Sequence, residues 1–182
     1  MARTSVQAPA PQPDPEVKKL QALVGHWTFK GEYKAGPLGP SGKVAGEYTG
    51  RMILGGFFFE GRLTEKAPFG EMRGLEVEAY DPAKKSFVSN WYLSGGSTIS
   101  GMLTASGNTF AWEGKLMAAG KEYQYKQTLM VTPDLRGFTV KAEISADGQT
   151  WTPWFEEKGT KAKPARKVIK VRPLKALKDM AK

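Results

Sequence analysis

The chain has 182 residues, a net charge of +9 and no cysteine, and 40% of its residues are hydrophobic. This length predicts one domain with a single core, and the lack of cysteine excludes disulfide bonds, thiolate metal sites and a cysteine nucleophile. No stretch approaches the roughly 18 apolar residues of a transmembrane helix, so no transmembrane segment is expected.

The positive charge is concentrated near the C-terminus. Residues 161–182 contain nine Lys or Arg residues and one acidic residue, whereas residues 16–160 contain 17 basic and 16 acidic residues. We therefore expect a Pro/Ala-rich leader over residues 1–15, a folded domain over residues 16–160 and a basic tail over residues 161–182. Such a tail is often solvated, but it can also dock on a protein partner or an anionic surface. The tail residues expected at such a contact are Lys163, Arg166, Lys167, Lys170, Arg172 and Lys175.

The leader bears on where the protein acts. It lacks the apolar run of about 7 to 15 residues that an intact signal peptide needs. Its composition fits either the spacer that remains after a signal peptide is removed or a plain cytoplasmic leader.

A short helix is predicted directly after the leader. Apolar residues in Glu16–Val24 recur at the spacing of a helix, with Asp14 as N-cap and Pro15 as the first helical residue. Gly25 is expected to end the helix.

From Trp27 onward the apolar period changes from 3.6 to 2, which is typical of half-buried antiparallel strands. Short turns such as Ala119-Gly120 and Asp147-Gly148 separate the strands. Ten strands are predicted, beginning near Trp27 and continuing over Val44–Leu54, Phe57–Thr64, Met72–Tyr80, Ser86–Leu93, Thr98–Thr104, Thr109–Leu116, Tyr123–Thr132, Phe138–Ser145 and Thr150–Glu156.

The strand order predicts an all-β fold. Ten sequential strands with no crossover helix leave a sandwich or an up-and-down barrel, and a meander that hides both of its edges favours the closed barrel. Glycines within strands, such as Gly101 and Gly114, fit the bends of a strongly coiled sheet. A barrel of eight to ten strands is wide enough to hold one small ligand.

Several segments resemble a known family. They are Leu23-Val24-Gly25-His26-Trp27, Ile53-Leu54-Gly55-Gly56-Phe57, Arg73-Gly74, Ala79-Tyr80-Asp81-Pro82 with Lys84-Lys85, and Phe87-Val88-Ser89-Asn90-Trp91. Together they resemble a bacterial family of unknown function in the calycin (lipocalin-like) superfamily, over about Leu20 to Lys158. The resemblance implies a lipocalin-like barrel, often on exported proteins, with no established activity. We therefore expect a periplasmic or secreted protein, with a cytoplasmic one as the alternative.

The apolar stripes of the strands supply candidates for a cavity wall. Arg73 shares a strand face with Leu75, Val77 and Ala79, and is the arginine expected inside, where its guanidinium could pair with a ligand carboxylate. The residues expected to bind a ligand are Phe29, Met52, Arg73, Leu75, Val77, Trp91, Met102, Trp112 and Tyr125. Plain core packing is the alternative interpretation of these apolar positions.

Motifs of enzymes are missing from the sequence. It has no Gly-x-Ser-x-Gly, no phosphate-binding Gly-Lys-Thr loop and no His-Glu-x-x-His. His26 is the only histidine, and haem-binding relatives use a histidine on a late strand. We expect no enzyme, no cofactor and no metal. The expected function is to hold a small, mostly apolar ligand in the barrel; the alternative is an assembly component whose basic tail docks on a partner.

Overall fold

The computed structural model describes residues 10–162 of the chain. Ten antiparallel strands form one closed barrel in which each strand pairs with its neighbours in sequence and β1 pairs with β10. The strands are β1 (Gly25–Tyr33), β2 (Gly42–Ile53), β3 (Phe58–Ala67), β4 (Gly70–Asp81), β5 (Ser86–Leu93), β6 (Thr98–Ser106), β7 (Thr109–Ala118), β8 (Lys121–Val131), β9 (Gly137–Ser145) and β10 (Thr152–Lys161). All ten predicted strands and the predicted all-β barrel are confirmed.

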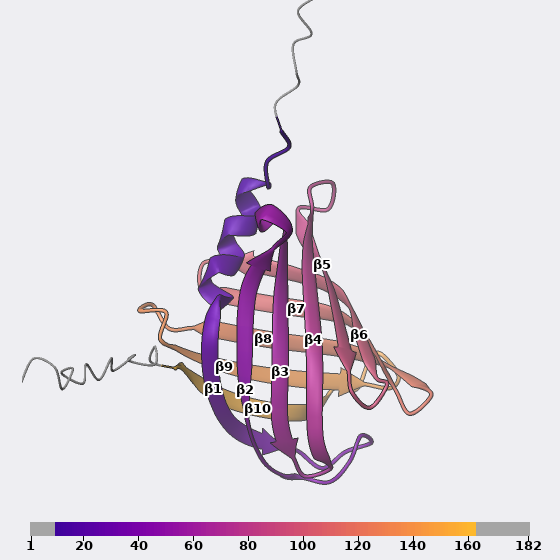
Figure 1. Ribbon diagram of the computed structural model, residues 1–182. Coiled ribbons are helices and arrows are strands. Elements are labelled where there is room, and N and C mark those ends of the chain that lie inside the picture. Colours follow the sequence, from indigo (N-terminus) through magenta and orange to yellow (C-terminus); the bar gives the residue numbers. More distant parts are fainter. Residues whose placement is uncertain (1–9, 163–182) are drawn as a thin grey trace, which may run out of the picture.

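The hairpins are closed by short turns whose backbone suits the residues present. In the β7–β8 turn, Ala119 and Gly120 both have positive φ angles, of 49° and 73°. Two such residues in succession match the right-handed twist of the flanking strands. Figure 1 shows the result: β1 to β4 lie in front of β7 to β9, which cross behind them at an angle.

A short helix covers one end of the barrel (Figure 1). The helix η1 (Pro15–Leu23) is of the tight 3-10 type, and the side chain of its N-cap Asp14 accepts a hydrogen bond from the Glu16 backbone N–H at 2.9 Å. Its buried residues are Val17, Leu20 and Leu23. The predicted helix and its N-terminal signals are therefore confirmed. A second 3-10 turn, η2 (Leu54–Gly56), joins β2 to β3 at this end.

Trp27 connects the helix to the barrel. Its indole Nε1 donates a hydrogen bond to the Leu23 carbonyl at 3.1 Å, and only 2% of the residue is exposed. The Lys161 ammonium lies 4.8 Å from the centroid of the indole ring. Lys161 is the last residue of β10, so the barrel extends one residue beyond the expected domain end at 160.

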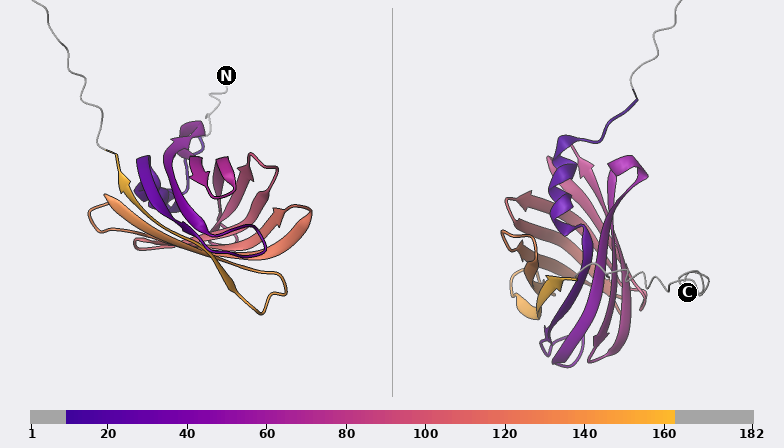
Figure 2. Two further views of the ribbon diagram at one scale, coloured as in Figure 1. Left: turned by 90° about the horizontal axis from the view of Figure 1, so that it is seen from below. Right: turned by 60° about the vertical axis from the view of Figure 1, so that its left-hand side comes forward.

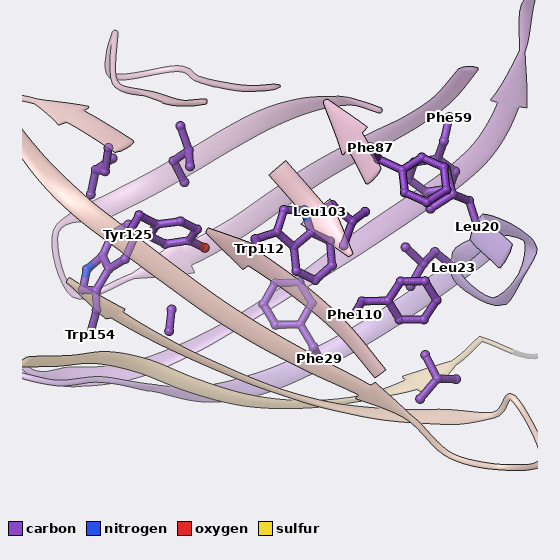
Figure 3. Packing of buried hydrophobic residues seen from close by; sticks show 14 of the residues in the cluster. Leu20, Leu23, Phe29, Phe59, Phe87, Leu103, Phe110, Trp112, Tyr125 and Trp154 are labelled. Carbon is purple, nitrogen blue, oxygen red and sulfur yellow. The ribbon is translucent and has the colours of Figure 1, made fainter. Parts of the chain in front are cut away.

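The barrel is filled at the end beneath η1. Leu20, Phe59, Phe87, Leu103 and Phe110 are completely buried there. Figure 3 shows Phe59, Phe87 and Leu20 together at one end of the interior, Phe29 and Trp112 near its middle, and Tyr125 with Trp154 at the other end. The two views of Figure 2 show η1 lying against one end of the curved sheet. No helix within residues 10–162 has the length and apolar character required to cross a membrane.

Candidate functional site

The interior of the barrel contains a cavity of about 100 Å³. A second hollow, of about 280 Å³, lies beside it among the turns opposite η1. Met72, Leu93 and Trp154 border both hollows, so the cavity continues toward that mouth. The long β1–β2 connection contributes Leu38 to the mouth.

The walls of the cavity are largely aromatic. They include Trp27, Phe29, Tyr33, Tyr48, Trp91, Trp112, Tyr125, Phe138, Trp154 and Phe155. Successive side chains of a strand point to opposite faces of the sheet, and these aromatic side chains are on the inner face. Because the sheet is closed, they surround the same cavity.

Two acids on the inner face of β4 are buried in this interior, and one of them, Glu76, lines the cavity. Glu76 and Glu78 are 1% and 0% exposed. Ser89 Oγ and Trp112 Nε1 both donate to Glu78 Oε1, at 2.8 and 3.1 Å. The Tyr48 hydroxyl donates to Glu76 Oε2. One oxygen of each carboxyl group is therefore held by donors from β2, β5 and β7.

The other oxygen of each carboxyl group receives no such donor. Glu76 Oε1 and Glu78 Oε2 are buried and accept no hydrogen bond from any other residue of the described chain. The two carboxyl groups are neighbours on the inner face of β4, two residues apart. Burial raises the pKa of both, and the charge of Glu76 raises the pKa of Glu78 further. Both shifts favour the neutral, protonated form of these acids.

The backbone around the pair is shaped to leave room for it. Gly61 on β3 pairs with Glu76 across the sheet. A Cβ atom at this position would collide with the Tyr48 hydroxyl and the Glu76 carboxyl group. Glycine at position 61 is thus required by the Tyr48–Glu76 contact.

A second pair of buried acids comes from β3 and β10. The Tyr33 hydroxyl donates to Glu65 Oε1 at 2.7 Å. Burial raises the pKa of Glu157 to about 8, and the nearby Glu65 carboxylate adds to the effect. Burial also raises the pKa of Glu65, against the opposing effect of the Tyr33 hydrogen bond.

Tyr125 on β8 lines the cavity together with an acid from each pair, Glu76 and Glu157. Burial raises the pKa of its phenol, and the charges of Glu157 and Glu76 raise it further. Its hydroxyl donates to Gln127 Oε1. Glu65, Glu76 and Glu157 all line the cavity, whereas no Lys, Arg or His side chain from residues 10–162 does so.

The structure brings together four of the nine residues expected to bind a ligand. Phe29, Trp91, Trp112 and Tyr125 line the cavity. Met52 is half-buried against the core but does not form part of the cavity wall.

The expected orientation of β4 is wrong. Arg73 lies outside the barrel with 73% of its side chain exposed, and its guanidinium binds Glu71 at 3.0 Å. Leu75 and Val77 share this outer face and are half-buried, and Met102 lies on the outer face of β6. The apolar side of β4 was expected inside, but the buried donors Tyr48, Ser89 and Trp112 hold its acidic side there instead.

A signal in the sequence could have corrected this orientation. Ala67 pairs with Gly70 across a two-residue turn, Pro68-Phe69. With this register, an inward Phe59 on β3 requires an inward Glu78 on β4, because directly paired residues share one face of the sheet.

The residues expected to make contacts through the basic tail lie outside the described residues. They are Lys163, Arg166, Lys167, Lys170, Arg172 and Lys175.

Metal ligands are not gathered at the cavity. Within residues 10–162, no group of three or more His, Cys, Asp or Glu side chains is placed to hold a metal ion. The lone His26 is on the outside of β1, where its Nε2 lies 3.2 Å from Glu47 Oε2.

Comparisons with known proteins place the chain in a family. The family described as "Protein of unknown function (DUF1579)" matches residues 12–161. No curated protein matches the sequence. The crystal structure of Rv2717c from M. tuberculosis aligns with a TM-score of 0.62 and 14% sequence identity, covering 84% of this chain and 100% of that chain. At this identity the likeness shows a shared fold.

Proposed function

The chain belongs to the DUF1579 family of unknown function, and we propose that it is a non-enzymatic binding protein that holds a small, mostly apolar ligand inside its barrel. The proposal includes the lipocalin-like relationship suggested by the sequence and a periplasmic or secreted location. One observation carries it: an aromatic-walled cavity adjoins a hollow at the barrel mouth.

The dimensions of the cavity limit the ligand. Pockets for drug-sized ligands have volumes of about 300–1,000 Å³, whereas an apolar cavity of about 150 Å³ takes up benzene. The inner cavity, at about 100 Å³, is smaller than this benzene site and therefore takes a compact group of one ring at most. A larger ligand would extend into the hollow at the mouth.

The structure also favours binding over packing as the role of the aromatic residues. The end of the barrel under η1 is filled by completely buried side chains such as Phe59 and Leu103. The aromatic side chains Trp91 and Phe155, in contrast, are only partly buried and border free space. Aromatic walls with a few polar groups are typical of sites for small molecules.

A pair of variants on one strand tests the proposal. Ile99 on β6 lines the cavity, and Met102 on the same strand faces outward. We expect saturation-transfer NMR to detect toluene bound to the wild type and to Met102→Phe, and to detect little in Ile99→Phe, where the larger ring fills the cavity. Lack of toluene binding to the wild type, or equal binding to Ile99→Phe, would overturn the proposal.

A further inference from the structure

We propose that the ligand of this cavity is a compact organic cation, whose positive group binds to Glu76 on the cavity wall and to its buried neighbour Glu78, and whose apolar part lies against the aromatic wall. This inference rests on the proposed function, because it names the class of ligand that the same cavity takes. It reverses the expectation of a carboxylate ligand that followed from an inward Arg73.

The sign of the charge in the cavity is the first argument. Three acids line the cavity, and no basic side chain of the described residues joins them. An anionic ligand would add a further negative charge to a poorly solvated space, where like charges repel strongly. A cation would provide the charge partner that the acids lack.

The unfilled acceptors are the second argument. Buried carboxyl oxygens nearly always accept a hydrogen bond, and leaving one without a donor costs free energy. Glu76 Oε1 and Glu78 Oε2 are such oxygens, on side chains that are almost completely buried. An ammonium group has three N–H donors and could serve both oxygens at once.

The aromatic surroundings are the third argument, and they favour an organic cation. The rings of Tyr48 and Trp91 lie beside Glu76, with their centroids 6.3 Å apart. The faces of such rings attract ammonium groups through their quadrupoles and also cover apolar carbon. A divalent metal ion would instead need a set of oxygen ligands, and the described acids do not form one.

Binding would exchange the cation for a proton. Burial raises the pKa of both Glu76 and Glu78, which favours their neutral forms in the empty protein. A bound ammonium group favours the carboxylates instead, so the O–H bond of a protonated carboxyl group breaks on binding and its proton passes to the solvent. The other titratable groups that face the interior are Tyr33 on β1, Tyr48 on β2, Glu65 on β3, Tyr125 on β8 and Glu157 on β10.

Three probes with the same ring separate charge from shape: benzylamine, benzyl alcohol and benzoate. In calorimetric titrations of the full chain at pH 7, we expect benzylamine to bind at least tenfold more tightly than benzyl alcohol, and benzoate to show no binding. Repeating the benzylamine titration in buffers of different ionisation enthalpy should show proton release. Equal binding of benzyl alcohol, tighter binding of benzoate or no benzylamine binding would overturn the inference. Toluene binding to the wild type, blocked by Ile99→Phe, would still support the proposed function in each of those cases.

Variants of the acids complete the test. Glu76→Gln should weaken benzylamine binding at least tenfold, abolish proton release and leave benzyl alcohol binding unchanged. Glu113→Gln, at an exposed position on β7, is the matched control and should bind as the wild type does. Glu78→Gln should act like Glu76→Gln, and it provides the test if the first variant fails to fold. Wild-type affinity for benzylamine in a folded variant of either acid would overturn the inference.

Discussion

Glu76 and Glu78 lie two residues apart on β4, and each has one buried carboxyl oxygen without a hydrogen-bond donor inside the barrel. Donors hold the other oxygen of each group, namely Tyr48 for Glu76 and Ser89 with Trp112 for Glu78. This arrangement is costly for an empty protein, and the cost predicts how the protein responds to mutation and pH.

Neutralising one acid should stabilise the empty protein. Glu76→Gln keeps an acceptor for the Tyr48 hydroxyl and supplies an N–H donor toward Glu78 without proton uptake. We expect the free energy of unfolding in urea at pH 7 to rise by about 1–3 kcal/mol. The exposed Glu113→Gln should change it by less than about 0.5 kcal/mol. A less stable Glu76→Gln would show that the acid pair supports the fold.

Stability should decrease as the pH rises. Burial raises the pKa of Glu157 from 4.5 in the unfolded chain to about 8 in the folded one. The protonated group therefore contributes stability below about pH 4.5, and this contribution is lost as the pH rises toward 8. The raised pKa values of Glu65, Glu76 and Glu78 act in the same direction.

The pH effect can be assigned to Glu157 by a neighbouring pair of variants. We expect the free energy of unfolding to fall by a few kcal/mol between pH 5 and pH 8, because each unit of pKa shift corresponds to about 1.4 kcal/mol. Glu157→Gln should reduce this dependence to the part that the other buried acids cause. Glu156→Gln, on the outer face of the same strand, should leave the dependence as it is. A wild-type stability that rises over this range would contradict the account.

Trp27→Phe should loosen the helix from the barrel. The change removes the hydrogen bond from Nε1 to the Leu23 carbonyl and leaves that carbonyl without its donor. We expect a loss of about 1–3 kcal/mol in the free energy of unfolding and faster amide exchange within η1. Trp151→Phe, in the turn before β10, is the control and should leave exchange in the helix unchanged.

Gly101→Ala should strain the wall between β6 and β7. Gly101 faces Gly114 across the sheet, and a Cβ atom at Gly101 would collide with the backbone of Glu113 and Gly114. We expect chemical denaturation to show a loss of about 1–3 kcal/mol. Gly95→Ala, where nothing lies within 4 Å of an added Cβ atom, should cost less than about 0.5 kcal/mol. Equal stability of the two variants would show that the sheet accommodates the added methyl group at position 101 without strain.

Most of the fold could be predicted from the sequence because its signals are local. A period of two, turn residues and an Asp-Pro helix start act over a few residues, and the structure contains every predicted strand and the helix. Closure of the barrel also followed, since consecutive hairpins leave only the first and last strands to be joined.

The acidic interior was harder to predict because it depends on contacts between distant strands. Along β4 alone, Leu75 and Val77 make the outward side look like the core side. The acids are turned inward by donors on β2, β5 and β7, of which Trp112 is 34 residues from Glu78. In the sequence, the inward orientation of the acids is indicated only by the register of the β3–β4 hairpin, in which Glu78 pairs with the inward Phe59.

Native mass spectrometry of the protein, isolated under mild conditions from its own source, tests the central claim most directly. We predict an added mass of one small molecule that is kept when residues 163–182 are deleted and lost in Ile99→Phe. A bare protein mass, with a protein or nucleic-acid partner that co-purifies and is lost on the same deletion, would contradict a ligand-binding barrel and favour the assembly component.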